Sequence, residues 1–310
     1  MFRDRRTLAL LLFARRHLAS LNFMLPPSDR SLRVMASLLA LWLSVSSCSA
    51  HADLVEQITA LTQQLAAHGE SAAVYCERAD LYRRHGEFAA ALVDISVADR
   101  LQTNAPPLAL DRARILSDAG RAAEALATIQ PFLTREPDHP EALIIRARSH
   151  ARLGNPTAAV ADYDAALAKC AAPGPDLFLE RARQQAVLGK LADAARGLDE
   201  AITNAPSFST LQLAAIDYDR QRGAFDSALS RVDGFVARYP VKEPWLTLRA
   251  EVLAQAGRNE EANATYQEVL AGLEKYPPIR RGLDLTKQLE ARARQGLARV
   301  QSTLLTTPKS

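Results

Sequence analysis

Residues 72–100, AAVYCERADLYRRHGEFAAALVDISVADR, contain one copy of a unit that recurs along this chain. Its glycine, Gly86, is the first of six glycines separated by 34, 34, 35, 34 and 34 residues. The chain has only 13 glycines in 310 residues, so composition alone does not produce this spacing. A fixed period of this length is typical of a helix-turn-helix repeat that buries its apolar face against its neighbours. The remaining five glycines are Gly120, Gly154, Gly189, Gly223 and Gly257.

Alanines recur in register with these glycines. When each glycine is numbered 15 in a unit of 34 residues, position 20 is alanine in all six units and position 8 in five. Small side chains at these positions allow the two helices of a hairpin to approach to about 8–10 Å. Glycine suits the left-handed backbone of the tight turn between them. Position 20 holds Ala91, Ala125, Ala159, Ala194, Ala228 and Ala262; position 8 holds Ala79, Ala113, Ala147, Ala182, Ile216 and Ala250.

Larger residues and prolines complete the unit. Position 24 is large in every unit, so we expect it to fill the core between stacked hairpins. Prolines fall mainly between units, and Asn155-Pro156 predicts an N-cap followed by proline at the first helical position. Pro131 lies within a predicted second helix, where we expect a kink. Position 24 holds Ile95, Ile129, Tyr163, Leu198, Val232 and Tyr266; the boundary prolines are Pro106, Pro137, Pro173, Pro206, Pro240 and Pro277.

This set of positions resembles the tetratricopeptide repeat, which has small residues at positions 8, 20 and 27, an aromatic residue near 11 and a turn residue near 15. The resemblance covers residues 71–278 and implies an all-α protein, a right-handed α-solenoid of about six helix-turn-helix units. No unit has tryptophan at position 4, and the unit with Ala215 and Ile216 has the least regular register. The first unit shows the pattern in Tyr75, Ala79, Tyr82, Gly86, Ala91 and Ala98.

Amphipathic segments flank the repeats at residues 53–70 and 279–310. Apolar residues recur in both at helical spacing, so we expect N- and C-terminal capping helices with polar outer faces. The second segment carries a net charge of +4 between Arg280 and Val300, so docking of a partner there is an alternative to capping. The apolar residues are Leu54, Ile58, Leu61 and Leu65 in the first segment, and Leu289, Ala293, Leu297, Val300 and Leu304 in the second.

Residues 1–52 are predicted to be a leader. Arg30 and Arg33 precede an uncharged run that ends in Ala50-His51-Ala52, which has the small-x-small pattern of a secretory cleavage site. This order predicts cleavage after Ala52 and export to the periplasm. Residues 1–23 are long and arginine-rich for a signal, so we suspect that translation begins at Met24 or Met35.

Two other interpretations of the leader stay open. Val45-Ser46-Ser47-Cys48 resembles a bacterial lipoprotein box, in which Cys48 becomes lipidated and the product is a membrane-anchored lipoprotein. The apolar run is alternatively retained as a membrane anchor. We expect membrane contact only through the leader or a lipidated Cys48.

The net charge of +3 belongs to the leader, which holds seven arginines and two aspartates. The remaining 31 basic and 33 acidic residues give residues 53–310 a net charge of −2. A slightly acidic solenoid has no global field that attracts nucleic acid, so we predict no nucleic-acid partner.

No catalytic motif is present. The six histidines show no metal-ligand spacing, and we find no phosphate loop or activated nucleophile, which predicts a chain that is not an enzyme and uses no cofactor or metal. Asp162 and Asp164 could be paired acids, but their helical spacing explains them as a solvated face. Cys76 and Cys170 lie nearly three repeats apart, so we expect no disulfide between them.

Position 7 is arginine in five units: Arg78, Arg112, Arg146, Arg181 and Arg249. In two of these units an aspartate, Asp94 or Asp162, lies on the second helix. We expect pairs within the repeat, with the arginine stem packed flat, rather than a ladder of binding residues.

The resemblance implies that positions 2, 5, 9, 12 and 13 of the first helix line a concave groove. Position 9 is arginine in three consecutive units, and position 5 is aliphatic beside it. We expect this groove to bind a peptide with a carboxylate flanked by apolar side chains, held by paired hydrogen bonds from arginine. The alternative is that position 5 packs against the next repeat and the arginines are merely solvated. The candidate groove residues are Arg114, Arg148, Arg183, Leu110, Ile144, Leu179 and Leu213.

These observations favour a non-catalytic protein–protein interaction scaffold or adaptor of the bacterial cell envelope. The alternative is an accessory subunit of an envelope enzyme or a lipid-anchored assembly factor. Both share the fold and differ in location and partner.

Overall fold

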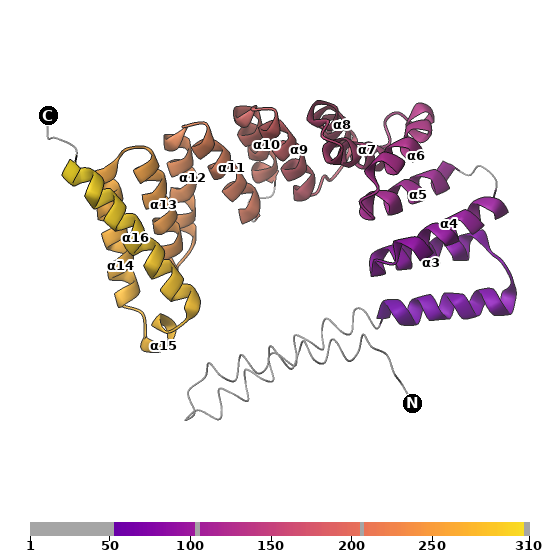
Figure 1. The fold of residues 1–310 in the computed structure, drawn as a ribbon, viewed down its shortest axis with the longest axis horizontal. Helices are drawn as coiled ribbons and strands as arrows, with labels where there is room; N and C mark the ends of the chain where they lie inside the picture. The colour runs from indigo at the N-terminus through magenta and orange to yellow at the C-terminus, as the bar shows by residue number, and fades with distance from the viewer. Residues whose placement is uncertain (1–52, 103–105, 205–207, 307–310) are drawn as a thin grey trace, which may run out of the picture. The chain divides into compact units, whose positions relative to one another are not determined.

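The computed structural model describes residues 53–102, 106–204 and 208–306, and the regular elements within these ranges are all α-helices (Figure 1). The leader, with the predicted cleavage after Ala52 and the alternative lipidation at Cys48, lies outside the described residues, as does Pro206. Across the described helices, none is both long enough and apolar enough to cross a membrane.

The helices follow the predicted hairpin order. Residues 53–68 are helical, and each later repeat supplies a first helix, called helix A, and a second, called helix B. The A helices are α3 (Ala72–His85), α5 (Pro106–Asp118), α7 (Pro140–Arg152), α9 (Pro175–Val187), α11 (Ser209–Gln221) and α13 (Glu243–Gln255). The B helices are α4 (Phe88–Leu101), α6 (Ala122–Arg135), α8 (Pro156–Lys169), α10 (Leu191–Asn204), α12 (Phe225–Arg238) and α14 (Asn259–Glu274); α15 (Pro278–Arg281) and α16 (Asp284–Thr306) follow.

The chain forms two compact units, Met1–Gly120 and Arg121–Ser310. In the first, α3 packs on α4 and α4 packs on α5. In the second, each helix from α6 to α14 packs on the next one along the chain, and α16 packs on α14 and α13. Packing between consecutive helices confirms the predicted all-α solenoid.

The glycine ladder marks the turns between helices A and B. All six glycines have positive φ, between 73° and 84°, which is the left-handed conformation that the sequence predicts. Gly69 also has a φ of 86° and follows the helical residues 53–68, a turn that the 34-residue period does not include. The capping prediction at Asn155 is only half right: Pro156 is the first residue of α8, but the Asn155 side chain makes no capping hydrogen bond.

The core follows the register of the ladder. All six alanines at position 20 are 0% exposed, and the residues at position 8, Ile216 included, are at most 1% exposed. The large residues at position 24 are at most 2% exposed, so the repeat with the least regular sequence keeps the same register. Pro131 lies inside α6, which continues to Arg135 as one helix.

The flanking segments pack on the terminal repeats. Ile58 and Leu61 are buried with Leu81 of α3. At the other end, Ala293 and Val300 of α16 join the core formed by α11–α14. Because these contacts cover the apolar faces of the end repeats, they place both segments where capping helices belong.

Candidate functional site

The candidate groove residues lie on A helices, and the structure separates them into core, paired and free side chains. Leu110 on α5 is 9% exposed and therefore belongs to the core. Ile144, Leu179 and Leu213 are half-buried on α7, α9 and α11. Leu179 and Leu213 also pack against core clusters, so the aliphatic stripe is partly used for packing between repeats.

Arg114 and Arg148 already hold carboxylates of this chain. Arg114 on α5 donates to Asp111 Oδ1 at 2.7 Å, one helical turn away. Arg148 on α7 forms a fork with Glu180 of α9, at 2.9 Å from Nε and 3.0 Å from Nη2. The paired geometry expected for a peptide carboxylate is therefore occupied at Arg148 by an internal one.

Tyr163 reinforces the fork at Arg148. Its hydroxyl donates to Glu180 Oε2 at 3.1 Å. Burial raises the pKa of Tyr163 well above its usual value, and the charge and hydrogen bond of Glu180 raise it further. A neutral tyrosine and a charged arginine thus hold Glu180 from two helices, which joins the third repeat to the fourth.

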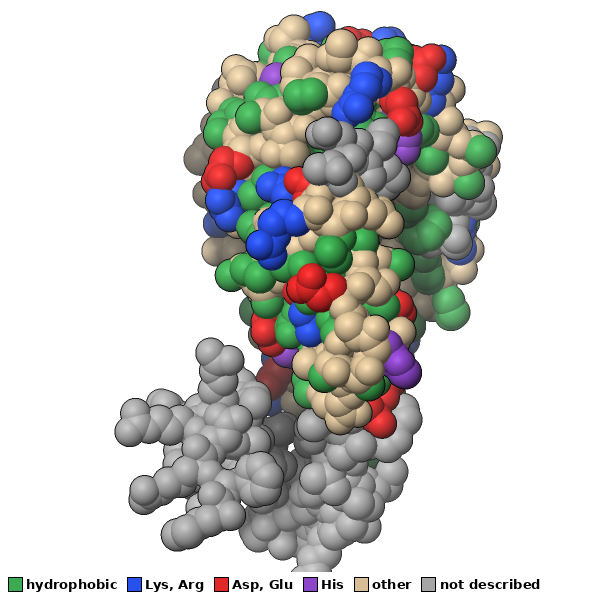
Figure 2. Space-filling view, turned by 90° about the vertical axis from the view of Figure 1, so that its right-hand side faces the viewer, with side chains coloured by type: hydrophobic (Ala, Val, Ile, Leu, Met, Phe, Trp, Pro, Cys, Tyr) green, Lys and Arg blue, Asp and Glu red, His purple; other side chains and the backbone are tan. Residues whose placement is uncertain are grey.

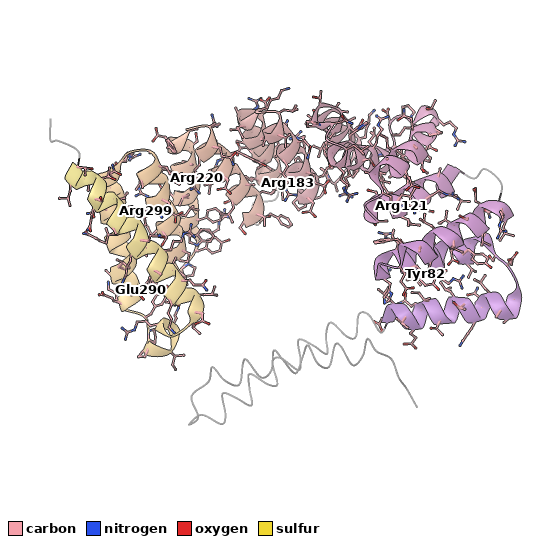
Figure 3. The ribbon with its side chains drawn as sticks, in the orientation of Figure 1. Tyr82, Arg121, Arg183, Arg220, Glu290 and Arg299 are labelled. Carbon is pink, nitrogen blue, oxygen red and sulfur yellow. The ribbon has the colours of Figure 1, made fainter. Side chains whose placement is uncertain are left out.

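Arg183 differs from both. It is exposed on α9 (Figure 3), and among the described residues no hydrogen bond or ion pair engages it. Val187, one turn further along α9, is 70% exposed. An unpaired guanidinium therefore lies beside exposed apolar surface on an A helix.

Tyr218 on α11 is a neighbour of Arg183 that the sequence did not single out. It is half-buried, and α11 packs on α9. Burial raises the pKa of Tyr218, whereas the positive charge of Arg183 lowers it. An aromatic residue at position 10, one repeat after an arginine at position 9, is the sequence signal for this pairing.

Two of the five arginines at position 7 form the predicted pair within a repeat, whereas the shortest ion pairs of the other three are with the preceding helix B: Arg112 with Asp99, Arg181 with Asp164 and Arg249 with Asp233. Arg78 donates to both carboxylate oxygens of Asp94 at 2.7 Å. Arg146 does the same to Asp162, at 2.8 and 2.6 Å. The two aspartate side chains are only 4% and 9% exposed, so these forks join helices A and B inside a repeat and do not face a ligand.

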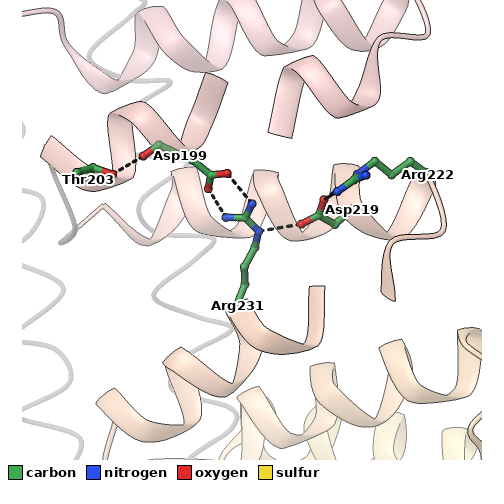
Figure 4. A network of polar contacts seen from close by, with 5 residues as sticks. All are labelled: Asp199, Thr203, Asp219, Arg222 and Arg231. Atoms are coloured by element: carbon green, nitrogen blue, oxygen red, sulfur yellow. Dashed lines mark hydrogen bonds and ion pairs between the residues drawn. The ribbon is translucent and has the colours of Figure 1, made fainter. Parts of the chain in front are cut away.

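The fifth repeat keeps this pairing with its charges exchanged (Figure 4). Ala215 stands at position 7, and Arg231 on helix B stands where other repeats have Asp94 or Asp162. Arg231 donates to Asp219 Oδ2 of α11 at 2.8 Å and to Asp199 of α10 at 2.5 and 3.0 Å. Arg222 holds the other oxygen of Asp219 at 2.9 Å. The network links three consecutive helices of two repeats.

The remaining charges give no single-sign patch on the surface that Figure 2 shows, where basic and acidic side chains lie next to one another. Within the described ranges, no three His, Cys, Asp or Glu side chains are grouped so that they could hold a metal ion. Cys76 and Cys170 are both free thiols.

Residues 110–177 and 213–278 match the family model of the tetratricopeptide repeat. Both matched segments begin at position 5 of a repeat, at Leu110 and Leu213, so the match and the glycine ladder share one register. The matched residues, together with the packing of consecutive hairpins, support a tetratricopeptide repeat protein.

Several solved structures are similar. A tetratricopeptide repeat protein from Parabacteroides merdae is 19% identical with a TM-score of 0.49, over 78% of this chain and 93% of that one. The protein MamA is 18% identical with a TM-score of 0.48, over 56% of this chain and 97% of that one. YrrB, described as a TPR protein with an unusual peptide-binding site, is 15% identical with a TM-score of 0.48, over 65% and 97% of the two chains. No curated protein matches the sequence significantly.

Proposed function

We infer that this chain serves, as tetratricopeptide repeat arrays generally do, as a scaffold for interactions between proteins. We propose that this chain is a non-catalytic scaffold that binds a peptide, or an extended segment of a partner protein, on the A helices α9 and α11. The observation that carries the proposal is that Arg183 is exposed and unpaired among the described residues, one helical turn before the exposed Val187.

The chemistry of this face fits a peptide carboxylate. A guanidinium presents parallel N–H donors that match the two oxygens of a carboxylate, and no carboxylate in the described part of the chain pairs with Arg183. The half-buried Leu179 and Leu213 offer apolar contacts on the same two helices. A peptide with apolar side chains around one acidic group would satisfy both.

The contacts of Arg148 favour Arg183 as the arginine that binds the partner. Arg148 is engaged with Glu180, and removing it would leave that carboxylate with only Tyr163 as a partner. We therefore assign Arg148 to holding adjacent repeats together and Arg183 to the partner.

Export to the periplasm is part of the proposal. The basic, apolar and small-x-small order of residues 30–52 supports it, with cleavage after Ala52 preferred over lipidation at Cys48.

The test is affinity capture from envelope extract of the native host, followed by measured affinity of each captured protein for variants. Arg183→Glu reverses the charge at this position of α9. We expect it to lower the affinity for the partner by at least about tenfold, because repulsion replaces a pair of charge-assisted hydrogen bonds. Arg196→Glu is the matched control, because Arg196 on α10 is 73% exposed and pairs only with Asp193 on its own helix. Equal affinity of wild type and Arg183→Glu would rule out this face as the binding site.

A further inference from the structure

A pocket of about 310 Å³ opens where the capping helix α16 meets the last two repeats. It is lined from α11 by Arg220, from α13 by Glu251 and Gln255, from α14 by Tyr266, and from α16 by Arg292 and Arg299. Figure 3 labels Arg220 and Arg299. The sequence did not predict this pocket, although the +4 charge of residues 280–300 is a signal for it.

Arg299 is the free cation of the pocket. Arg292 is held by Glu251, with Nε and Nη2 at 2.5 and 2.6 Å from the two carboxylate oxygens. Arg220 donates to the neutral amide oxygen of Gln255 at 2.8 Å, and its contact with the exposed Asp217 is a long 3.4 Å. Arg299 is exposed, and its guanidinium has no hydrogen bond or ion pair within the described part of the chain. Three guanidinium groups thus share one lining carboxylate.

Tyr266 supplies a second, independent feature. It is only 2% exposed, yet it lines the pocket, and its hydroxyl finds no hydrogen-bond partner among the described residues. Its ring lies against Gly296 of α16, where any Cβ would collide with it. The hydroxyl oxygen is not among the buried unpartnered atoms of the described residues, so it opens into the pocket and offers a donor to an acceptor that enters.

Charges around the phenol agree with this placement. Burial raises the pKa of Tyr266, and Glu251 raises it further, whereas Arg292, Arg299 and Arg220 lower it. The hydroxyl therefore stays protonated at neutral pH and can donate. The groups that surround it are mainly cations.

We propose that this pocket binds a carboxylate of the partner peptide, through the guanidinium groups of Arg299 and Arg220 and the hydroxyl of Tyr266. Carboxylate oxygens accept from all three donors, and Ala254 and Val300 line the same pocket as apolar contacts for the carbon chain that bears the group. The inference rests on the proposed function, because Arg220, Glu251 and Gln255 occupy A-helix positions 12, 9 and 13, which the tetratricopeptide repeat uses for its groove. It adds a second anchoring point beyond Arg183, built by α16 and not by a repeat.

The test uses small probes on the full chain labelled with ¹⁵N-arginine. The probes are an acetylated dipeptide with a free terminal carboxylate, its amide, an acetylated glutamate amide with a side-chain carboxylate, and inorganic phosphate. We expect saturable shifts of the Nε–H signals of Arg299 and Arg220 with a carboxylate probe and none with the amide. The two carboxylate probes distinguish a chain terminus from an acidic side chain.

Variants locate the site. Arg299→Gln should lower the affinity for the carboxylate probe about tenfold, and Tyr266→Phe about threefold, because each substitution removes a hydrogen-bond donor. Arg294→Gln is the control on the same helix, because Arg294 pairs with Glu290 and does not line this pocket. We expect it to bind the probe as wild type does.

Three results would overturn the inference: no saturable shift with either carboxylate, equal shifts with the amide, or saturation by phosphate alone. Loss of partner binding in Arg183→Glu with unchanged binding in Arg299→Gln would also count against the pocket while leaving the proposed scaffold intact. If both variants bind the partner as wild type does, the result counts against both the pocket and the binding face on α9 and α11.

Discussion

Gly154 shows why the turn between helices A and B requires glycine. It has a φ of 76°, and a Cβ built there would meet nothing within 4 Å. The requirement for glycine is therefore purely conformational, because a side chain would have space but would force an L-residue into the left-handed region.

We expect Gly154→Val to lower the free energy of unfolding by about 1–2 kcal/mol, the cost of a left-handed β-branched residue. Denaturant unfolding measures it. Gly234→Val is the matched control: Gly234 lies inside α12, has no neighbour within 4 Å of a built Cβ and no positive φ, so the same change should be close to neutral. Equal losses in both variants would remove the left-handed turn as the cause.

The role of each arginine depends on which carboxylate lies within hydrogen-bonding distance of it. Arg146 pairs with Asp162 inside a repeat, Arg148 bridges two repeats through Glu180, and Arg183 pairs with no carboxylate of the described residues. These three side chains lie on A helices at positions that look equivalent or adjacent in the sequence. Arg183 is therefore the arginine that we propose for the partner.

At the scale of helices, the fifth repeat shows that the pairing between helices A and B tolerates an exchange of charge. In this repeat the aspartate, Asp219, lies on helix A and the arginine, Arg231, lies on helix B. The sequence suggested an insecure register here because position 7 had lost its arginine. The structure shows the same register, because Ala228 and Val232 are buried as their equivalents are in other repeats.

Asp219→Ala should lower the free energy of unfolding by about 3 kcal/mol, because the 0% exposed carboxylate is the partner of two arginines and its loss leaves them partly unpaired. Thermal or denaturant unfolding checks the value. Asp217→Ala, two residues earlier on α11, is the control: its carboxylate is 63% exposed and 3.4 Å from Arg220, so we expect a change within about 0.5 kcal/mol. A similar effect in both variants would contradict a structural role for the network in Figure 4.

Over the whole molecule, charge divides at the predicted leader boundary. Residues 1–52 carry the excess of arginine, and residues 53–310 carry a net charge of −2. The proposed periplasmic scaffold requires that the leader be removed or used as an anchor. Asp53 is the first residue after the predicted cleavage site.

The intact mass of the protein purified from its native host tests this. We expect a chain that begins at Asp53, because Ala50 and Ala52 place small residues at both recognised positions before the cut. A diacylated N-terminal Cys48 would instead establish the lipoprotein alternative. A mass that includes the leader would contradict removal.

The amino-acid sequence determined the period of 34 residues, the hairpin, the turn glycines and the core positions. Small residues at positions 8 and 20 and large residues at position 24 recur at spacings that only paired helices bury together. The intra-repeat forks at Arg78 and Arg146 were predictable for the same reason. The binding face was not. Arg148 and Glu180 lie 32 residues apart and come within 3.0 Å only when neighbouring repeats pack, and Arg299 and Tyr266 line one pocket only because α16 packs on α14. Tertiary packing therefore decided which arginines are neutralised and which stay free, because an ion pair depends on separation in space, which sequence spacing alone does not set.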